Sequence, residues 1–220
     1  AEIIKPEEAW NYGINLTYKL EEGEIEGSLG ADFYRTEFQN QIFPNYDSYP
    51  GIALVYNFTG TSVSNGFQTE ANLRFWEVAG VKLAYNYLDV YRMVNGEKFI
   101  LPFNSKHKIL STFSYNPLSR DRHIDINFHW YGIQKLPSTD QYPSELRQPG
   151  WSKPYTIINA QYAFAINEFE FYLGCENIFD FRQKQPIMNW QNPFSPYFDT
   201  SFIWGPTRGR EFYWGIRYRV

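Results

Sequence analysis

The sequence predicts an all-β fold, an antiparallel transmembrane β-barrel, on three observations. Apolar and polar residues alternate with a period of two through most of the 220 residues. Short and long connections alternate between the segments that show this period. Phe, Tyr and Trp make up 20% of the chain, and they gather near the ends of the alternating segments, as the interfacial girdles of a membrane barrel do.

The alternation is clearest in four segments. From Trp10 to Leu20, Trp, Tyr, Ile and Leu share one parity, and the closing segment from Glu211 to Val220 repeats this pattern. Residues 81–87 and 124–130 do the same with Val, Leu, Ile and aromatic residues. Alternate side chains of a strand point to opposite faces, so each segment has one apolar and one polar wall. In chain order, strands are expected at 9–20, 23–43, 51–77 (irregular near Gly60), 80–93, 106–117, 122–134, 153–166, 168–179 and 210–220.

The connections between these strands differ systematically in length. The short ones are Glu21-Glu22, Val78-Ala79, Asn116 to Asp121 and Asn167. The long ones are Phe43 to Gly51, Val94 to Ser105, Gln134 to Ser152 and Asp180 to Gly209. In an up-and-down sheet all short links lie at one end and all long links at the other, which is typical of outer-membrane barrels. The strand lengths also suit the ~9–11 residues that a tilted strand needs to cross a bilayer.

Alternation alone also fits soluble β-sandwiches and small ligand-binding barrels, in which the apolar wall forms the core. Nine is an odd strand number, whereas single-chain bacterial barrels have even numbers, so either the strand count is wrong by one or further strands lie outside these residues. The wall of a plugged 22-stranded transporter needs roughly 540 residues at this strand spacing. Residues 1–220 are therefore expected to be the C-terminal part of such a barrel, with no plug domain in this chain.

Composition and motifs argue against other classes of protein. The net charge is −4 and no Lys/Arg run is present, which disfavours nucleic-acid binding. No apolar stretch reaches the ~18 residues of a membrane helix. The chain has no nucleophile-elbow, zinc-protease, phosphate-loop or dinucleotide motif. With a single cysteine, Cys175, and three scattered histidines (His107, His123 and His129), no enzyme activity, cofactor or metal site is expected.

Five segments resemble, in order, strands of TonB-dependent outer-membrane receptors: Lys5 to Leu20, Asn65 to Phe75, Leu101 to Tyr115, Pro154 to Asp180 and Gly209 to Val220. The third carries a Pro-x-x-x-x-His strand start, and the fourth ends in Glu-Asn-Ile-Phe-Asp. The chain departs from the family in ending on Val220, where an aromatic residue is usual.

The resemblance implies an active importer in the bacterial outer membrane, with a scarce nutrient such as a ferric siderophore, haem or cobalamin as its substrate. A passive porin or a non-transport adhesion barrel is the alternative. The implied partners are the TonB complex through the missing N-terminal part, that N-terminal part itself, outer-membrane lipid, the barrel-assembly machinery and a surface lipoprotein. Gly215, Tyr218 and Val220 resemble the C-terminal signal that the assembly machinery reads. The alternative is that they are only closing-strand residues on the lipid wall.

Substrate contacts are expected on the long, aromatic connections, which the family topology places outside the cell. The candidates are Tyr46, Tyr49, Tyr142, Trp151, Trp190, Tyr197 and Phe198. Aromatic side chains in loops of low charge can stack on a flat or partly apolar ligand. The alternative is that these rings pack on one another as a cap or contact a partner lipoprotein.

Overall fold

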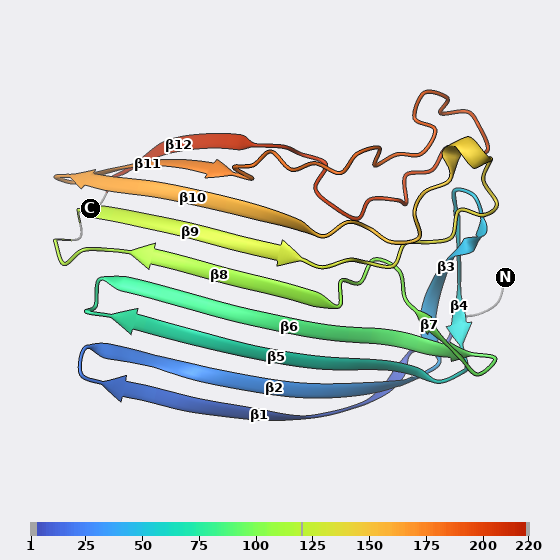
Figure 1. Ribbon diagram of the computed structural model, residues 1–220, viewed down its shortest axis with the longest axis horizontal. Coiled ribbons are helices and arrows are strands. Elements are labelled where there is room, and N and C mark those ends of the chain that lie inside the picture. The colour runs from blue at the N-terminus through green and yellow to red at the C-terminus, as the bar shows by residue number, and fades with distance from the viewer. Residues whose placement is uncertain (1–3, 120, 219–220) are drawn as a thin grey trace.

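The computed structural model describes residues 4–119 and 121–218, and among them ten strands form one antiparallel sheet (Figure 1). Its order is β1 (Glu8–Glu22), β2 (Ile25–Gln39), β5 (Ser62–Phe75), β6 (Ala79–Val94), β8 (His107–Tyr115), β9 (Arg122–Tyr131), β10 (Tyr155–Ile166), β11 (Phe169–Glu176) and β12 (Glu211–Tyr218). The short β7 (Glu97–Ile100) pairs with β6. This up-and-down order confirms the predicted all-β antiparallel class.

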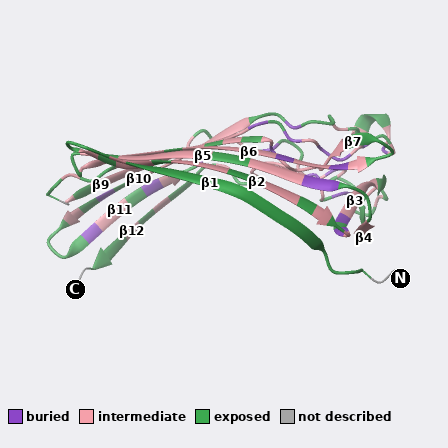
Figure 2. Cartoon of the chain, turned by 90° about the horizontal axis from the view of Figure 1, so that it is seen from below, coloured by how far each residue is buried: buried purple, intermediate pink, exposed green. Residues whose placement is uncertain are grey.

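The sheet is a bent, open arc rather than a flat layer (Figure 2). β1 and β12 are its two edges and lie on opposite sides of it (Figure 1). The longest strands, β1, β2, β5 and β6, have 14 to 16 residues each, which is long enough to cross a bilayer and project beyond it.

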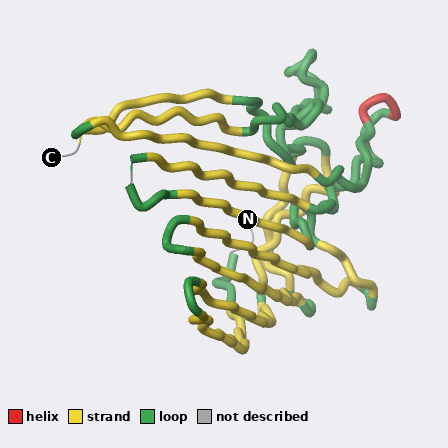
Figure 3. The backbone as a smooth tube through the Cα atoms, turned by 60° about the vertical axis from the view of Figure 1, so that its left-hand side comes forward, coloured by secondary structure: helices red, strands yellow, loops and turns green. Residues whose placement is uncertain are grey.

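The two ends of the sheet differ as the sequence predicts. Tight turns join the strands at one end, here called the turn end, and long connections gather at the other, the loop end (Figure 3). Gly23 (φ 61°) and Asn167 (φ 52°) occupy left-handed turn positions, which Gly and Asn adopt readily. The first turn lies at Gly23 and Glu24 rather than at the expected Glu21-Glu22, because β1 runs on to Glu22.

Two expected strands, 23–43 and 51–77, prove to be broken. Asn40 leaves the strand conformation with a φ of 55° and ends β2. Residues 59–61 are not in a strand either, and they separate β4 (Ile52–Phe58) from β5. β3 (Gln41–Tyr49) and β4 therefore form a separate two-stranded sheet. The connection expected at Phe43 to Gly51 is in fact a hairpin that occupies most of residues 40–61.

Strand register separates an apolar face, the outer wall, from a polar face, the inner wall. Between β11 and β12, the outer pairs are Phe169–Tyr218, Phe171–Ile216 and Leu173–Trp214. On the opposite face, Arg217 lies across from Glu170, with 3.0 Å between Nη1 and Oε1. This confirms that Trp214, Ile216 and Tyr218 share one face and Arg217 the other, whereas Arg219 and Val220 lie outside the described residues.

The inner wall is lined by hydrogen-bonded polar side chains. Thr112 donates to Asn127 (2.9 Å) and Ser114 donates to Asp125 (2.8 Å), joining β8 to β9. Further round the arc, Tyr213 donates to Gln161 (3.1 Å). A polar face of this kind suits a water-filled or protein-filled interior, whereas the apolar outer wall suits lipid.

The compact apolar core lies among the connections at the loop end. Leu136, Tyr142, Met188 and Phe202 are buried there, and partly buried Phe103, Leu146, Tyr197 and Trp204 pack around them. A short 3-10 helix, η1 (Ser144–Leu146), belongs to the same connections. No helix in the described residues is long and apolar enough to cross a membrane.

Candidate functional site

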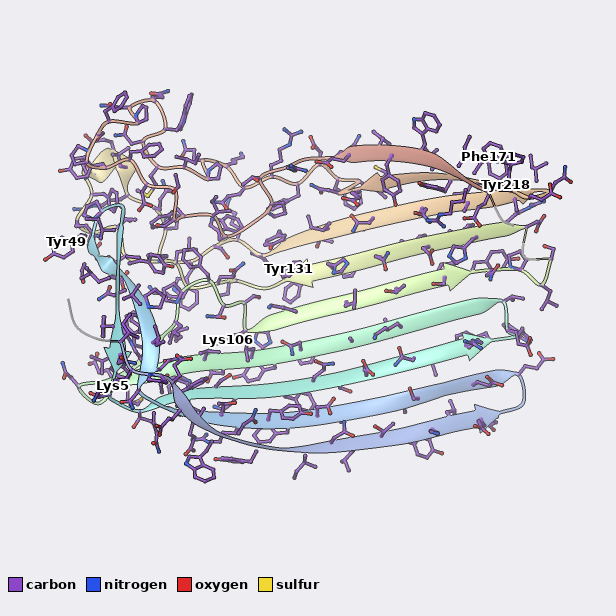
Figure 4. All side chains as sticks on the ribbon, turned by 180° about the vertical axis from the view of Figure 1, so that it is seen from behind. Lys5, Tyr49, Lys106, Tyr131, Phe171 and Tyr218 are labelled. Carbon is purple, nitrogen blue, oxygen red and sulfur yellow. The ribbon has the colours of Figure 1, made fainter. Side chains whose placement is uncertain are left out.

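The tip of the β3–β4 hairpin meets the connection between β11 and β12 (residues 177–210), and a pocket of about 280 Å³ lies between them. We call it the tip pocket. It is lined by Tyr46, Tyr49, Gly51, Ile52, Ala53, Phe198, Asp199, Thr200 and Ser201. Figure 4 shows Tyr49 at the loop end, far from Phe171 and Tyr218.

Local sequence shapes the hairpin side of the pocket. Gly51 has a φ of 68°, a left-handed conformation that permits the tight turn between β3 and β4. A Cβ atom on Gly51 would lie 3.0 Å from the carbonyl oxygen of Phe198, so a glycine also allows the two walls to approach closely. Asp47 then ties the hairpin to its surroundings by accepting a hydrogen bond from the Ser138 amide at 2.6 Å.

Tyr142 joins the two walls of the pocket from behind. Its hydroxyl donates to Asp199 Oδ2 (2.6 Å) and accepts a hydrogen bond from the Gly51 amide (3.2 Å). Only 3% of Tyr142 is exposed. Burial, and secondly the Asp199 carboxylate, raise the pKa of Tyr142 above its ordinary value. The phenol therefore stays protonated at neutral pH and keeps donating to Asp199.

The opposite wall is held by its own hydrogen bonds. Asp199 Oδ1 accepts from the Ser201 amide (2.7 Å), and the backbones of Asp199 and Met188 pair. Deeper in the connection, the Gln183 side chain accepts from the Trp204 amide (2.7 Å) and donates to the Phe202 carbonyl (2.6 Å). These contacts give an irregular segment a defined shape without a helix or strand.

The base of the hairpin is fastened to the sheet by Arg92 of β6, which is 5% exposed. Its guanidinium carbon lies 3.3 Å from the ring centroid of Phe43 and 4.6 Å from that of Phe99. Arg92 also donates to the Tyr56 hydroxyl at 3.3 Å. Cation–π contacts at a desolvated site contribute ~2 kcal/mol or more, so Arg92 stabilises the position of the hairpin on the sheet.

The structure brings together some of the predicted contact residues and separates others. Tyr46, Tyr49 and Phe198 line the tip pocket. Tyr142 is buried behind it, with the Tyr197 ring 6.0 Å away. The two tryptophans lie outside the pocket lining: Trp151 faces the Lys135 ammonium at 5.5 Å, and Trp190 is largely exposed.

Several residues of the site are not among the sequence-based candidates. Asp199, Thr200 and Ser201 supply the polar part of the lining, and nothing in their local sequence distinguishes them from other polar loop residues. The Tyr-Pro-Gly sequence at 49–51 is the one local signal, because it marks a turn. Among the described residues, no group of three or more His, Cys, Asp and Glu residues could hold a metal ion.

The predicted assembly residues lie at the opposite side of the molecule, on the edge strand β12. A Cβ atom on Gly215 would clash with the hydroxyl end of the Tyr172 ring, so any larger residue there would displace that ring. Tyr218 packs against Phe169, with 5.2 Å between ring centroids. The third residue of the predicted signal, Val220, lies outside the described residues.

Comparison with known proteins identifies a family whose model matches the sequence and solved structures with a similar fold. The family model described as "TonB dependent receptor-like, beta-barrel" matches residues 2–178. A search of curated protein sequences found no match.

Solved structures similar to the chain include the ferric-catecholate import receptor Fiu of E. coli K12 (TM-score 0.64, 17% identity), covering 97% of this chain and 28% of that one. The siderophore receptor PirA of Acinetobacter baumannii has a TM-score of 0.65 and 16% identity, and the match covers 98% of this chain and 32% of that one. The FrpB iron transporter of Neisseria meningitidis has a TM-score of 0.62 and 14% identity, and the match covers 99% of this chain and 31% of that one. The chain thus spans about a third or less of these structures.

Proposed function

The chain belongs to the TonB-dependent receptor-like β-barrel family, and from this premise we propose that it is the C-terminal part of the barrel of an active outer-membrane importer. Barrels of this family lie in the outer membrane of Gram-negative bacteria. One observation carries the proposal. The connections at the loop end pack around their own apolar core into a folded cap with a pocket, and this cap adjoins a sheet whose inner wall is polar and whose outer wall is apolar.

Each part of this arrangement suits import. The apolar outer wall suits lipid and the polar inner wall suits a plug and a transported solute. A hollow of about 850 Å³ lies against the inner wall at the turn end, among residues such as Lys82, Thr112 and Ser114. The loop end, which faces outside in the family topology, offers the first contact to an arriving ligand.

The remainder of the proposed receptor supplies what these 220 residues do not. A plug from the N-terminal part closes the lumen, and the TonB complex pulls on that part to open a path. An external energy source is needed because the outer membrane holds no ATP, and an unplugged pore wide enough for a large nutrient would leak. The further proposed partners are the barrel-assembly machinery at β12, lipid at the outer wall and a surface lipoprotein at the cap.

The proposed substrate is a scarce nutrient such as a ferric siderophore, haem or cobalamin. The similar solved structures support this class in a general way, since they include a ferric-catecholate import receptor and an iron transporter. The aromatic connections also suit a flat or partly apolar ligand.

The test uses the complete receptor that contains this chain, expressed in a host strain with and without TonB. Accumulation of ⁵⁵Fe-loaded siderophores, haem and cyanocobalamin is measured in both strains. TonB-dependent accumulation of one of these nutrients is the expected result. Equal, non-saturable entry of small solutes in both strains would instead identify a passive pore and overturn the proposal.

A further inference from the structure

The tip pocket is too small to hold a whole metal chelate. Its volume, about 280 Å³, lies just below the ~300–1,000 Å³ that pockets for drug-sized ligands occupy. A single six-membered ring with its substituents fits such a space. The pocket is therefore a subsite for one group of a ligand.

The charge of the lining disfavours an anion. Among the described residues that line the pocket there is no Lys, Arg or His, and the one charged side chain is the carboxylate of Asp199, which is 6% exposed. A phosphate, carboxylate or catecholate group placed here would lose water without gaining a cation, and it would face a like charge. A neutral group avoids both penalties.

The lining is rich in hydroxyl groups that are free to bind. The hydroxyls of Tyr46, Tyr49, Thr200 and Ser201 make no hydrogen bond to any other described residue. A hydroxyl both donates and accepts, so four of them match a ligand that itself carries several hydroxyls. The rings of Tyr46, Tyr49 and Phe198 add apolar surface for the less polar face of such a ligand.

The pocket is also rigid before any ligand arrives. Tyr142 holds Gly51 on one wall and Asp199 on the other, and Asp199 is further fixed by the Ser201 amide. Pre-formed walls lower the entropy cost of binding, so a small group can be held by few contacts.

We propose that the tip pocket binds a neutral, polyhydroxylated ring, that is, a sugar unit of the transported ligand. This rests on the proposed function, because it assigns a ligand class to a site of the proposed importer.

The experiment uses the complete receptor, purified in detergent, and isothermal titration with neutral methyl glycosides of glucose, galactose, mannose and N-acetylglucosamine. Methyl glucuronide is the matched anionic probe, since it keeps the glucoside ring and replaces a hydroxymethyl group by a carboxylate. At least one neutral glycoside should bind, and glucuronide should bind about tenfold more weakly than glucoside. Binding of none of the neutral glycosides, or equal or tighter binding of glucuronide, would overturn the proposal.

Two pocket variants locate the binding. Thr200→Val and Tyr49→Phe each remove one hydroxyl at an exposed position, so neither should disturb folding, and each should weaken glycoside binding about 3- to 10-fold. Ser144→Ala, on η1 and outside the pocket lining, is the control and should leave binding unchanged. Unaltered binding in both pocket variants would contradict the assignment. TonB-dependent uptake by a receptor that binds none of the neutral glycosides would leave the importer standing and remove only the sugar subsite.

Discussion

At the scale of single residues, Tyr142 is the side chain on which the tip pocket depends most. It makes one hydrogen bond to each wall, at Asp199 and Gly51. Tyr142→Phe keeps the ring but leaves a buried carboxylate oxygen and a backbone amide without these partners. Removing one partner of a buried hydrogen bond costs ~1–3 kcal/mol.

We therefore expect Tyr142→Phe to speed amide hydrogen exchange at residues 49–52 and 197–201, without changing assembly of the barrel. Tyr197→Phe is the matched control, because the Tyr197 hydroxyl bonds to no described residue. Equal exchange in the two variants would show that the hydroxyl of Tyr142 does not hold the walls.

The stabilisation of the pocket walls by the Tyr142 hydroxyl should also depend on pH, and amide hydrogen exchange of the wild-type receptor at residues 49–52 and 197–201 measures it. The pKa of Tyr142 is raised in the folded state. The stabilising contribution of the protonated Tyr142 hydroxyl is therefore complete below the ordinary tyrosine pKa of ~10, and it is lost as the pH rises through the higher pKa of the folded state.

A second residue-scale prediction tests the outer wall. Ile216 lies across from Phe171 on the apolar face of β12. Ile216→Arg should lower the free energy of unfolding of the complete receptor by ~2–4 kcal/mol if the site lies at the bilayer midplane. Thr17→Arg, on the inner wall of β1, should have a much smaller effect. Urea unfolding from lipid vesicles measures both, and a reversed order of the two variants would invert our assignment of the walls.

At the scale of elements, the β3–β4 hairpin is the part that the sequence pattern does not predict. Its residues continue the period of two from β2 on one side and into β5 on the other. Alternation shows that residues are extended, but it does not show with which strand they pair. The hairpin is separated from β2 by a single residue, Asn40, which has a φ of 55°. It is separated from β5 by only three residues, 59–61. The nine main strands were predictable because each repeats the alternation over many residues.

The hairpin should depend on Arg92. Arg92→Ala removes the guanidinium that stacks on Phe43 and bonds Tyr56, and a desolvated cation–π contact contributes ~2 kcal/mol. We expect the variant receptor to be cleaved faster by limited proteolysis within residues 40–61. Arg35→Ala is the control. It breaks an exposed pair with Glu37 (2.8 Å) and a hydrogen bond to Asn65 (3.0 Å), neither of which touches the hairpin, and it should change cleavage within residues 40–61 little, because exposed ion pairs contribute ~0–1 kcal/mol. Equal cleavage of both variants would exclude Arg92 as the fastening.

At the scale of the whole molecule, the candidate site was only partly predictable. Composition pointed to aromatic loop residues, and Tyr46, Tyr49 and Phe198 do meet in one pocket. The polar wall at Asp199 was not predictable, because it acquires its role only where the chain brings residue 199 beside residue 51. The buried position of Tyr142 could not be read from sequence for the same reason, since exposed and buried loop aromatics look alike there.

The open edges of the sheet lead to the last prediction. In the part of the chain that the structure describes, the 15 residues of β1 pair with β2 alone and β12 pairs with β11 alone, so each edge presents unpaired amides and carbonyls at membrane depth. In lipid every such group costs several kcal/mol. Residues 1–220 expressed alone should therefore fail to insert, and should show neither heat-modifiable migration nor protease resistance in outer-membrane vesicles. Co-expression with the remaining part of the proposed receptor should restore both, because the strands of that part would pair with β1 and β12 and close the barrel. A protected, heat-modifiable species formed by the fragment alone would mean that the two edges can satisfy each other or a second copy, and that the arc is not part of a larger barrel.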